Sequence, residues 1–150
     1  MVRHLHDSNR KMPLEGDSQF KQLKKVYEDA NEMAGKTLGV VGLGRIGIET
    51  IKIGIGLGMN VIAYDKFIPT KDIQLNFFDG QSLTFHIKSV DSLETIYKQS
   101  DFISFHVPAQ DGYLVGEAEF KMMKNGAMIV NAARGGVIDE KALVKALDAG

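Results

Sequence analysis

Short apolar runs alternate with longer amphipathic stretches along most of this chain. A short run favours a buried strand, whereas apolar positions three or four apart favour a helix. Because strands and helices alternate, the pattern predicts an α/β fold with a doubly wound, mostly parallel sheet of about five to six strands. We expect strands at residues 38–41, 61–64, 83–87, 101–107 and 127–132, and helices at 46–57, 92–99, 117–123 and 138–149.

Residues 1–35 differ from the rest of the chain. Residues 1–11 are polar and predict a helix, which Pro13 and Gly16 interrupt before a second charged stretch. The segment has too few apolar side chains to form a core, so we expect it to pack on the main domain or on another chain. The sequence therefore predicts an N-terminal helical linker followed by a larger domain at residues 36–150.

A glycine-rich turn follows the first strand of the larger domain. Residues 42–47 (GLGRIG) fit the G-x-G-x-x-G pattern inside a strand–turn–helix–strand unit. Gly42 permits the tight turn, Gly44 lets a pyrophosphate approach the backbone, and Gly47 lets the helix pack close to the strand. The free N–H groups at the start of the helix then favour phosphate. The unit predicts a Rossmann fold that binds a dinucleotide.

Asp65 ends the second strand, 18 residues after Gly47. A carboxylate at this place accepts hydrogen bonds from the hydroxyls of the adenosine ribose, and it repels a 2′-phosphate. The acid therefore predicts NAD rather than NADP. On this unit alone, the alternative is a packing turn in some other α/β protein.

Four polar or glycine-containing segments follow predicted strands: Gly42, Asp65, residues 106–108 and residues 131–134. The carboxyl ends of parallel strands share one edge of a sheet, and ligands bind along that edge where the strand order reverses. We therefore expect the four segments to converge on one site.

Arg134 is the first candidate for chemistry, because it follows a buried strand and precedes two glycines. Its planar guanidinium can bind a carboxylate through two parallel hydrogen bonds. On composition alone, an ion pair with Asp139 or Glu140 is an equally good interpretation. His106 could act as a general base. A histidine at a strand end is more often a hydrogen-bonded structural residue that lines a pocket, and we favour that interpretation.

Composition argues against several other functions. The net charge of −1, from 18 basic and 19 acidic side chains, gives no reason to expect nucleic acid or an anionic membrane as a partner. The sequence has no cysteine, and therefore no thiolate metal site, and we expect no metal. No apolar run approaches the roughly 20 residues of a membrane span. We expect a cytoplasmic protein.

Two segments resemble one enzyme family. Residues 36–47 and 101–147 are similar to the nucleotide-binding domain of the D-isomer-specific 2-hydroxyacid dehydrogenases. The second segment carries a strand with H-x-P, a helix with a Met-Lys end, and the run N-x-A-R-G-G-x-x-D-E. The resemblance covers residues 36–150 well and the first 35 loosely. It is greatest to the members that act on 3-phosphoglycerate, in serine biosynthesis.

The resemblance implies roles for particular residues. Arg134 would be the catalytic arginine, which binds the substrate carboxylate and polarises the C2 oxygen, and Asp65 would bind the ribose. The remaining residues of the implied cofactor site are Gly42, Gly44, Arg45, Ile46 and Gly47 in the pyrophosphate turn, with Val107, Pro108, Ala132 and Ala133 around the nicotinamide and adenosine.

The chain also departs from the family. The family's catalytic histidine and its paired glutamate lie downstream of the arginine, and here no histidine follows Arg134. Residues 74–89 are longer than the corresponding family segment. The resemblance thus implies the cofactor-binding part of an NAD-dependent oxidoreductase that moves a hydride between NAD and a small 2-hydroxy acid.

We expect these 150 residues to be inactive by themselves. The alternative function is that of an NAD-sensing corepressor of the same family, which would bind protein partners. Since the nucleotide domains of the family pair, the resemblance also implies a homodimer.

Overall fold

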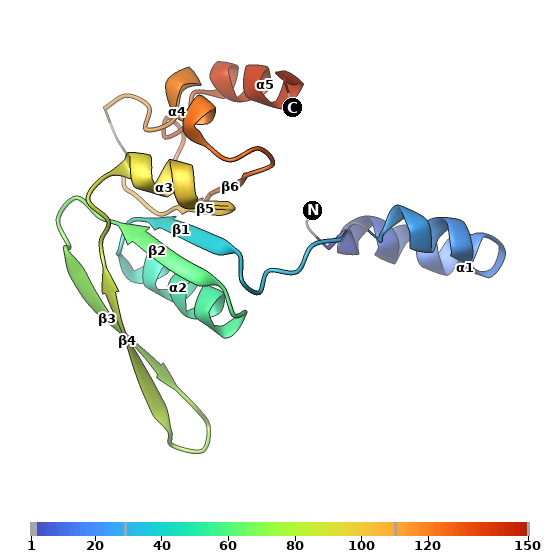
Figure 1. The fold of residues 1–150 in the computed structure, drawn as a ribbon, viewed down its shortest axis with the longest axis horizontal. Coiled ribbons are helices and arrows are strands. Elements are labelled where there is room, and N and C mark those ends of the chain that lie inside the picture. The colour runs from blue at the N-terminus through green and yellow to red at the C-terminus, as the bar shows by residue number, and fades with distance from the viewer. Residues whose placement is uncertain (1–2, 29, 110, 150) are drawn as a thin grey trace. The chain divides into compact units, whose positions relative to one another are not determined.

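The computed structural model describes residues 3–28, 30–109 and 111–149 (Figure 1). The chain separates into two compact units, Met1–Met33 and Ala34–Gly150. Within the described ranges, no helix combines the length and the apolar character that crossing a membrane requires. Whether the first unit packs on the larger domain or on a partner stays a prediction, as does the cytoplasmic location.

The N-terminal unit is built on one long helix with a bend. α1 spans Leu5–Val26 and contains Pro13. The predicted interruption at Pro13 and Gly16 is therefore wrong. The backbone leaves helical geometry at Gln19 instead, with φ −125° and ψ 22°.

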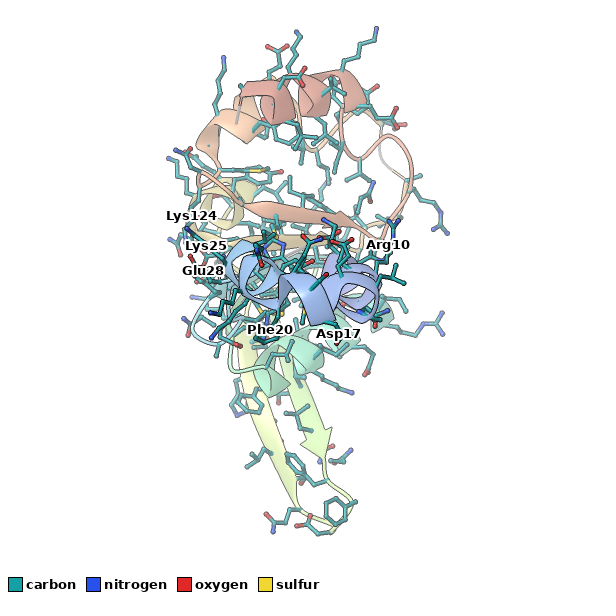
Figure 2. The ribbon with its side chains drawn as sticks, turned by 90° about the vertical axis from the view of Figure 1, so that its right-hand side faces the viewer. Arg10, Asp17, Phe20, Lys25, Glu28 and Lys124 are labelled. Carbon is teal, nitrogen blue, oxygen red and sulfur yellow. The ribbon has the colours of Figure 1, made fainter. Side chains whose placement is uncertain are left out.

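Polar contacts join residues on the two sides of this bend. The Tyr27 hydroxyl donates to Asp7 Oδ2 (2.9 Å), and Arg3 Nη1 donates to Glu32 Oε2 (2.7 Å). A bend near Gln19 allows these contacts to form, because it turns the chain back toward its own start. Most other side chains of α1 point to solvent, and Figure 2 labels four of them: Arg10, Asp17, Phe20 and Lys25.

The larger unit contains a four-stranded parallel sheet with the order β2-β1-β5-β6. The register places Val41 opposite Tyr64 on one side and opposite Phe105 on the other. The strand order therefore reverses at β1, which is where ligands bind in such sheets. The strands are β1 (Thr37–Val41), β2 (Asn60–Tyr64), β5 (Phe102–Phe105) and β6 (Met128–Asn131).

Helices cover both faces of this sheet (Figure 1). Ser92 caps the helix at Leu93–Gln99 by accepting a hydrogen bond from the Thr95 N–H. The predicted α/β fold with a doubly wound parallel sheet is confirmed, but in the described part of the chain the sheet has four strands rather than five to six. α2 (Arg45–Gly56) lies on one face, and α3 (Leu93–Gln99), α4 (Glu117–Met122) and α5 (Glu140–Ala149) lie on the other.

The main core forms around the end of the sheet where β1 and β5 lie side by side. Val41 and Phe105 are buried in it together with Ile96 of α3, and Phe120 of α4 packs against the same cluster. Burying an apolar side chain of this size stabilises the fold by about 1.5–3 kcal/mol. The core therefore fixes the strand ends from which the candidate site is built.

Two further strands form a separate antiparallel hairpin, β3 (Thr70–Asn76) and β4 (Ser82–Lys88). The predicted strand at residues 83–87 exists, but it pairs with β3 rather than joining the parallel sheet. A turn at Asp79–Gly80 joins the two strands, and the Asp79 carboxylate accepts the Gln81 N–H (3.0 Å). The hairpin extends away from the sheet in Figure 1.

One face of the hairpin is apolar, because residues of alternating position point the same way. Ile73 near its base is 1% exposed, whereas Phe78 at the turn is fully exposed. β3 contacts α2, and β4 contacts β2. Since an isolated two-stranded hairpin is only marginally stable in water, burial at its base is what anchors it.

Replacing Ile73 by alanine should destabilise the larger unit by about 2–5 kcal/mol, because it removes a buried side chain and leaves a cavity. Urea unfolding followed by circular dichroism measures this loss. Gln74→Ala is the matched control, since Gln74 is exposed on the opposite face of the same strand. A loss below about 1 kcal/mol for Ile73→Ala would show that the hairpin does not depend on this anchor.

Candidate functional site

The glycine turn between β1 and α2 is packed too closely for larger side chains at two positions. A Cβ on Gly47 would lie 1.9 Å from the carbonyl oxygen of Gly42. Gly42 has φ +104°, and a Cβ there would lie 2.6 Å from the carbonyl oxygen of His106. Gly44 is different, because a Cβ on it would meet nothing within 4 Å. Packing therefore explains Gly42 and Gly47, and it leaves Gly44 facing open space.

The Asp65 carboxylate fastens this turn to the end of β2. Its Oδ2 accepts the Leu43 N–H at 2.7 Å, and its Oδ1 accepts the N–H groups of Phe67 (2.8 Å) and Ile68 (3.0 Å). A carboxylate offers about four acceptor sites, so this arrangement fixes the group and still leaves acceptor capacity. The Asp65 N–H in turn donates to Ser89 Oγ (2.9 Å), at the exit of the hairpin.

Two neighbouring cavities lie along the carboxyl edge of the sheet. The larger is about 640 Å³ and is lined by Gly42, Gly44 and Asp65, among others. The smaller is about 360 Å³ and is lined by Ile46, Val107, Pro108, Ala132, Ala133 and Arg134, together with His106 and Ala109. The linings share His106, Val107 and Pro108. The four predicted segments therefore do converge on one edge.

Arg134 lies on the smaller cavity with its guanidinium exposed. Its Nη1 donates to the Ala133 carbonyl (3.0 Å), and the ion pairs found within the described ranges do not include it. Asp139 instead accepts the N–H groups of Lys141 (3.0 Å) and Ala142 (3.3 Å) at the start of α5. Of the two interpretations left open, the structure does not support the ion pair.

His106 is hydrogen-bonded and lines a pocket, as the favoured interpretation predicts. Its Nε2 lies 2.8 Å from Ser104 Oγ and 3.1 Å from Thr50 Oγ1. Its Nδ1 is buried and has no hydrogen-bond partner among the described residues. Burial lowers the pKa of the imidazole below its usual value. Burial therefore favours the neutral form of the ring.

Sequence reasoning missed several residues of this region. Phe67, Ile68, Leu93 and Leu114 line the larger cavity, and no motif marks them. Two predicted residues, Arg45 and Gly47, line neither cavity. Ser104 could have been found as a neighbour of His106, since residues two apart on a strand share a face, whereas Thr50 comes from α2 and its contact with His106 depends on the packing of that helix.

Comparison with known proteins places this geometry in a family. A sequence model of the D-isomer specific 2-hydroxyacid dehydrogenase NAD binding domain matches residues 1–150. The chain belongs to this family. D-3-phosphoglycerate dehydrogenase of Methanocaldococcus jannaschii is 42% identical over 121 residues, which are 79% of this chain and 21% of that protein. The expected family and cofactor class are thereby confirmed.

Other members are comparably similar. Hydroxypyruvate reductase of Thermotoga maritima is 38% identical over 138 residues, covering 91% of this chain and 39% of that protein. The apo structure of D-lactate dehydrogenase from Escherichia coli aligns with a TM-score of 0.76 and 32% identity, covering 99% of this chain and 42% of that one. The chain thus spans between about a fifth and two fifths of the length of these relatives.

The start of α2 fits the phosphates of the family's cofactor, NAD. Its N-cap is Gly44, so no side chain caps the helix, and no acidic residue stands in its first turn. Arg45 adds a positive charge there. An uncapped helix start favours phosphate, because its N–H groups and dipole both point toward an anion. The open space at Gly44 gives that anion access to the backbone.

The partly buried His106 ring should make stability fall with acidity. Its pKa is lowered in the folded chain, so between that value and about 6.5 the unfolded chain binds more protons. The free energy of unfolding is therefore fully retained above about pH 6.5 and falls as the pH drops toward the folded pKa. Urea unfolding between about pH 5 and 7 measures the trend, with His106→Gln as the non-titrating control.

In wild-type protein, NMR titration of the His106 ring reports its pKa directly. A folded pKa at or above about 6.5, or equal pH dependence in the wild-type chain and the His106→Gln variant, would contradict this account.

Proposed function

We propose that this chain is the cofactor-binding domain of an NAD-dependent enzyme that transfers a hydride between NAD and a small 2-hydroxy acid. The observation that carries the proposal is the pair of adjoining cavities, one holding the glycine turn and Asp65 and the other Arg134. A dinucleotide needs such a continuous edge, with the phosphate site between a ribose site and a reaction site. Family membership supports the same proposal.

In this proposal the larger cavity holds the adenosine half. The Asp65 carboxylate accepts a ribose hydroxyl with its remaining acceptor capacity, while Leu43, Phe67 and Ile68 keep it in place. Gly44, Arg45, Ile46 and Gly47 form the pyrophosphate turn. Apolar Ile68, Leu93 and Leu114 give the cavity the walls that a flat base requires.

The smaller cavity holds the nicotinamide half and the substrate. Val107, Pro108, Ala132 and Ala133 line it for the ring, and the cofactor supplies the hydride chemistry when bound. Arg134 binds the substrate carboxylate and polarises the C2 oxygen, because its exposed fork uses a single described hydrogen bond to the backbone. The proton carrier of the family is not among these residues, so we propose that the 150 residues alone do not turn over substrate.

For the whole protein we propose 3-phosphoglycerate as the first substrate to test, which would place it in serine biosynthesis. The similarity to D-3-phosphoglycerate dehydrogenase supports this choice. Relatives named hydroxypyruvate reductase and D-lactate dehydrogenase are also close, so initial rates with 3-phosphoglycerate, glycerate and D-lactate decide among them. All three relatives are named as oxidoreductases, which favours an enzyme over a corepressor.

We further propose that the protein pairs as a homodimer through its N-terminal unit. Leu5, Leu14, Phe20 and Val26 of α1 are each more than half exposed, while Leu23 is its buried side chain. Large apolar side chains along one helix favour burial against another chain. Light scattering at high protein concentration measures the mass, and a monomer would contradict the pairing.

Gly44→Ala should abolish most NAD binding without disturbing the fold. The backbone at Gly44 (φ −73°, ψ −177°) suits any residue, and the new methyl group meets no protein atom within 4 Å. It would occupy the space proposed for a phosphate, so affinity should fall by about tenfold or more. Calorimetric titration with NAD measures this, and Gly56→Ala is the control because its Cβ also meets open space. Unchanged NAD affinity in Gly44→Ala would reject the phosphate site.

The wild-type chain should bind NADPH about tenfold more weakly than NADH, because the Asp65 carboxylate repels a 2′-phosphate. Asp65→Asn keeps the size of the side chain and removes its charge, so the ratio of the two affinities should move toward one. Fluorescence titration with each reduced cofactor gives both affinities. Equal affinities in the wild-type chain would contradict the role of Asp65, whatever the absolute strength of binding.

A further inference from the structure

His106 lies at the boundary between the two cavities. It lines the larger one with Asp65 and the smaller one with Arg134. Val107 and Pro108, which follow it in the chain, line both as well. Any molecule that extends from one cavity to the other must therefore pass this segment.

The His106 ring connects β5 to α2. Its Nε2 lies 2.8 Å from Ser104 Oγ on β5 and 3.1 Å from Thr50 Oγ1 on α2. Thr50 Oγ1 also donates to the Ile46 carbonyl (3.1 Å). Because that bond uses the hydroxyl's single proton, the Thr50 oxygen acts as an acceptor toward the ring. Nε2 then carries the proton, and Nδ1 keeps a lone pair.

The backbone of His106 contacts the same unit. Its N–H donates to the Val41 carbonyl (2.8 Å) at the end of β1. Its carbonyl oxygen lies so close to Gly42 that a Cβ there would come within 2.6 Å. Ring and backbone together therefore determine how far the glycine turn stands from Val107 and Pro108.

We propose that His106, through its link to Thr50, is a positioning residue that holds the glycine turn and the Val107–Pro108 segment at the spacing that one dinucleotide needs to lie across both cavities. The inference rests on the proposed binding of NAD. It adds a role for a residue that neither the glycine motif nor the arginine motif contains. A burial role alone would require only a ring of the right size, whereas this role requires the Nε2 contact.

Thr50→Val removes the hydroxyl and keeps the side-chain shape, so it separates the two roles. NAD spans both cavities, whereas ADP reaches from the adenosine side only to the phosphates. We expect NAD affinity to fall about fivefold, the effect of losing one hydrogen bond, while ADP affinity stays within about twofold. Calorimetric titration of the 150-residue chain with NAD and with ADP measures both.

Conservative variants provide the matched controls. Thr50→Ser keeps the hydroxyl and should bind NAD like the wild-type chain. His106→Gln can place an amide nitrogen near the Nε2 position and should retain most NAD affinity. His106→Asn is too short to reach Thr50 and should behave like Thr50→Val. Should Thr50→Val fail to fold, Ser104→Ala tests the other contact of Nε2.

The outcomes are distinct. NAD affinities equal to wild type in Thr50→Val and His106→Asn would overturn the inference, and so would equal losses for NAD and ADP, which indicate only general packing. A wild-type chain that binds neither ligand would overturn the proposed function, and this inference with it. Selective loss of NAD affinity, restored in Thr50→Ser and His106→Gln, would support the positioning role.

Discussion

The close approach of three backbone segments at the end of β1 is the constraint on which the rest of the site depends. Gly47 permits the first turn of α2 to touch the Gly42 carbonyl, and Gly42 permits β1 to touch the His106 carbonyl. No side chain larger than hydrogen fits at either contact. Because the segments cannot separate without losing buried packing, the start of α2 is held at the edge of the sheet. An uncapped helix start held there is a site for an anion.

Two charged side chains of the site, Asp65 and Arg134, have roles in the proposed recognition of ligands, and Asp65 also has a structural role. The Asp65 carboxylate receives three backbone N–H groups, one from the glycine turn and two from its own loop. Hydrogen bonds to a carboxylate are stronger than neutral ones, so the turn is stiffened by the same group that is proposed to bind the ribose. Arg134 is the counterpart at the other end of the site. It is exposed, and none of the ion pairs among the described residues includes it. In the proposed function, the end with Asp65 binds a neutral sugar and the end with Arg134 binds an anion.

Sequence patterns located most of the elements, with β3 as an exception, but not all of their partners. The unusual length of residues 74–89 was visible in the sequence, and the strand predicted at residues 83–87 exists. That β3 and β4 pair with each other was not predictable, because alternation shows that one face is buried and not which strand lies beside it. The bend of α1 at Gln19 rather than at Pro13 was not predictable for a similar reason. It goes with contacts such as Tyr27 with Asp7, which join residues far apart in sequence.

By itself, the sequence determined the βαβ unit, the glycine turn, the acid at the end of β2 and the position of Arg134 after a strand, because each depends on local geometry and spacing. The family followed from the same motifs. Only the tertiary structure decided that Asp65 binds the turn, that Asp139 caps α5 and leaves Arg134 exposed, and that His106 joins Thr50 to Ser104. These contacts bring together side chains from different elements, and their distances arise only when the core packs those elements against one sheet.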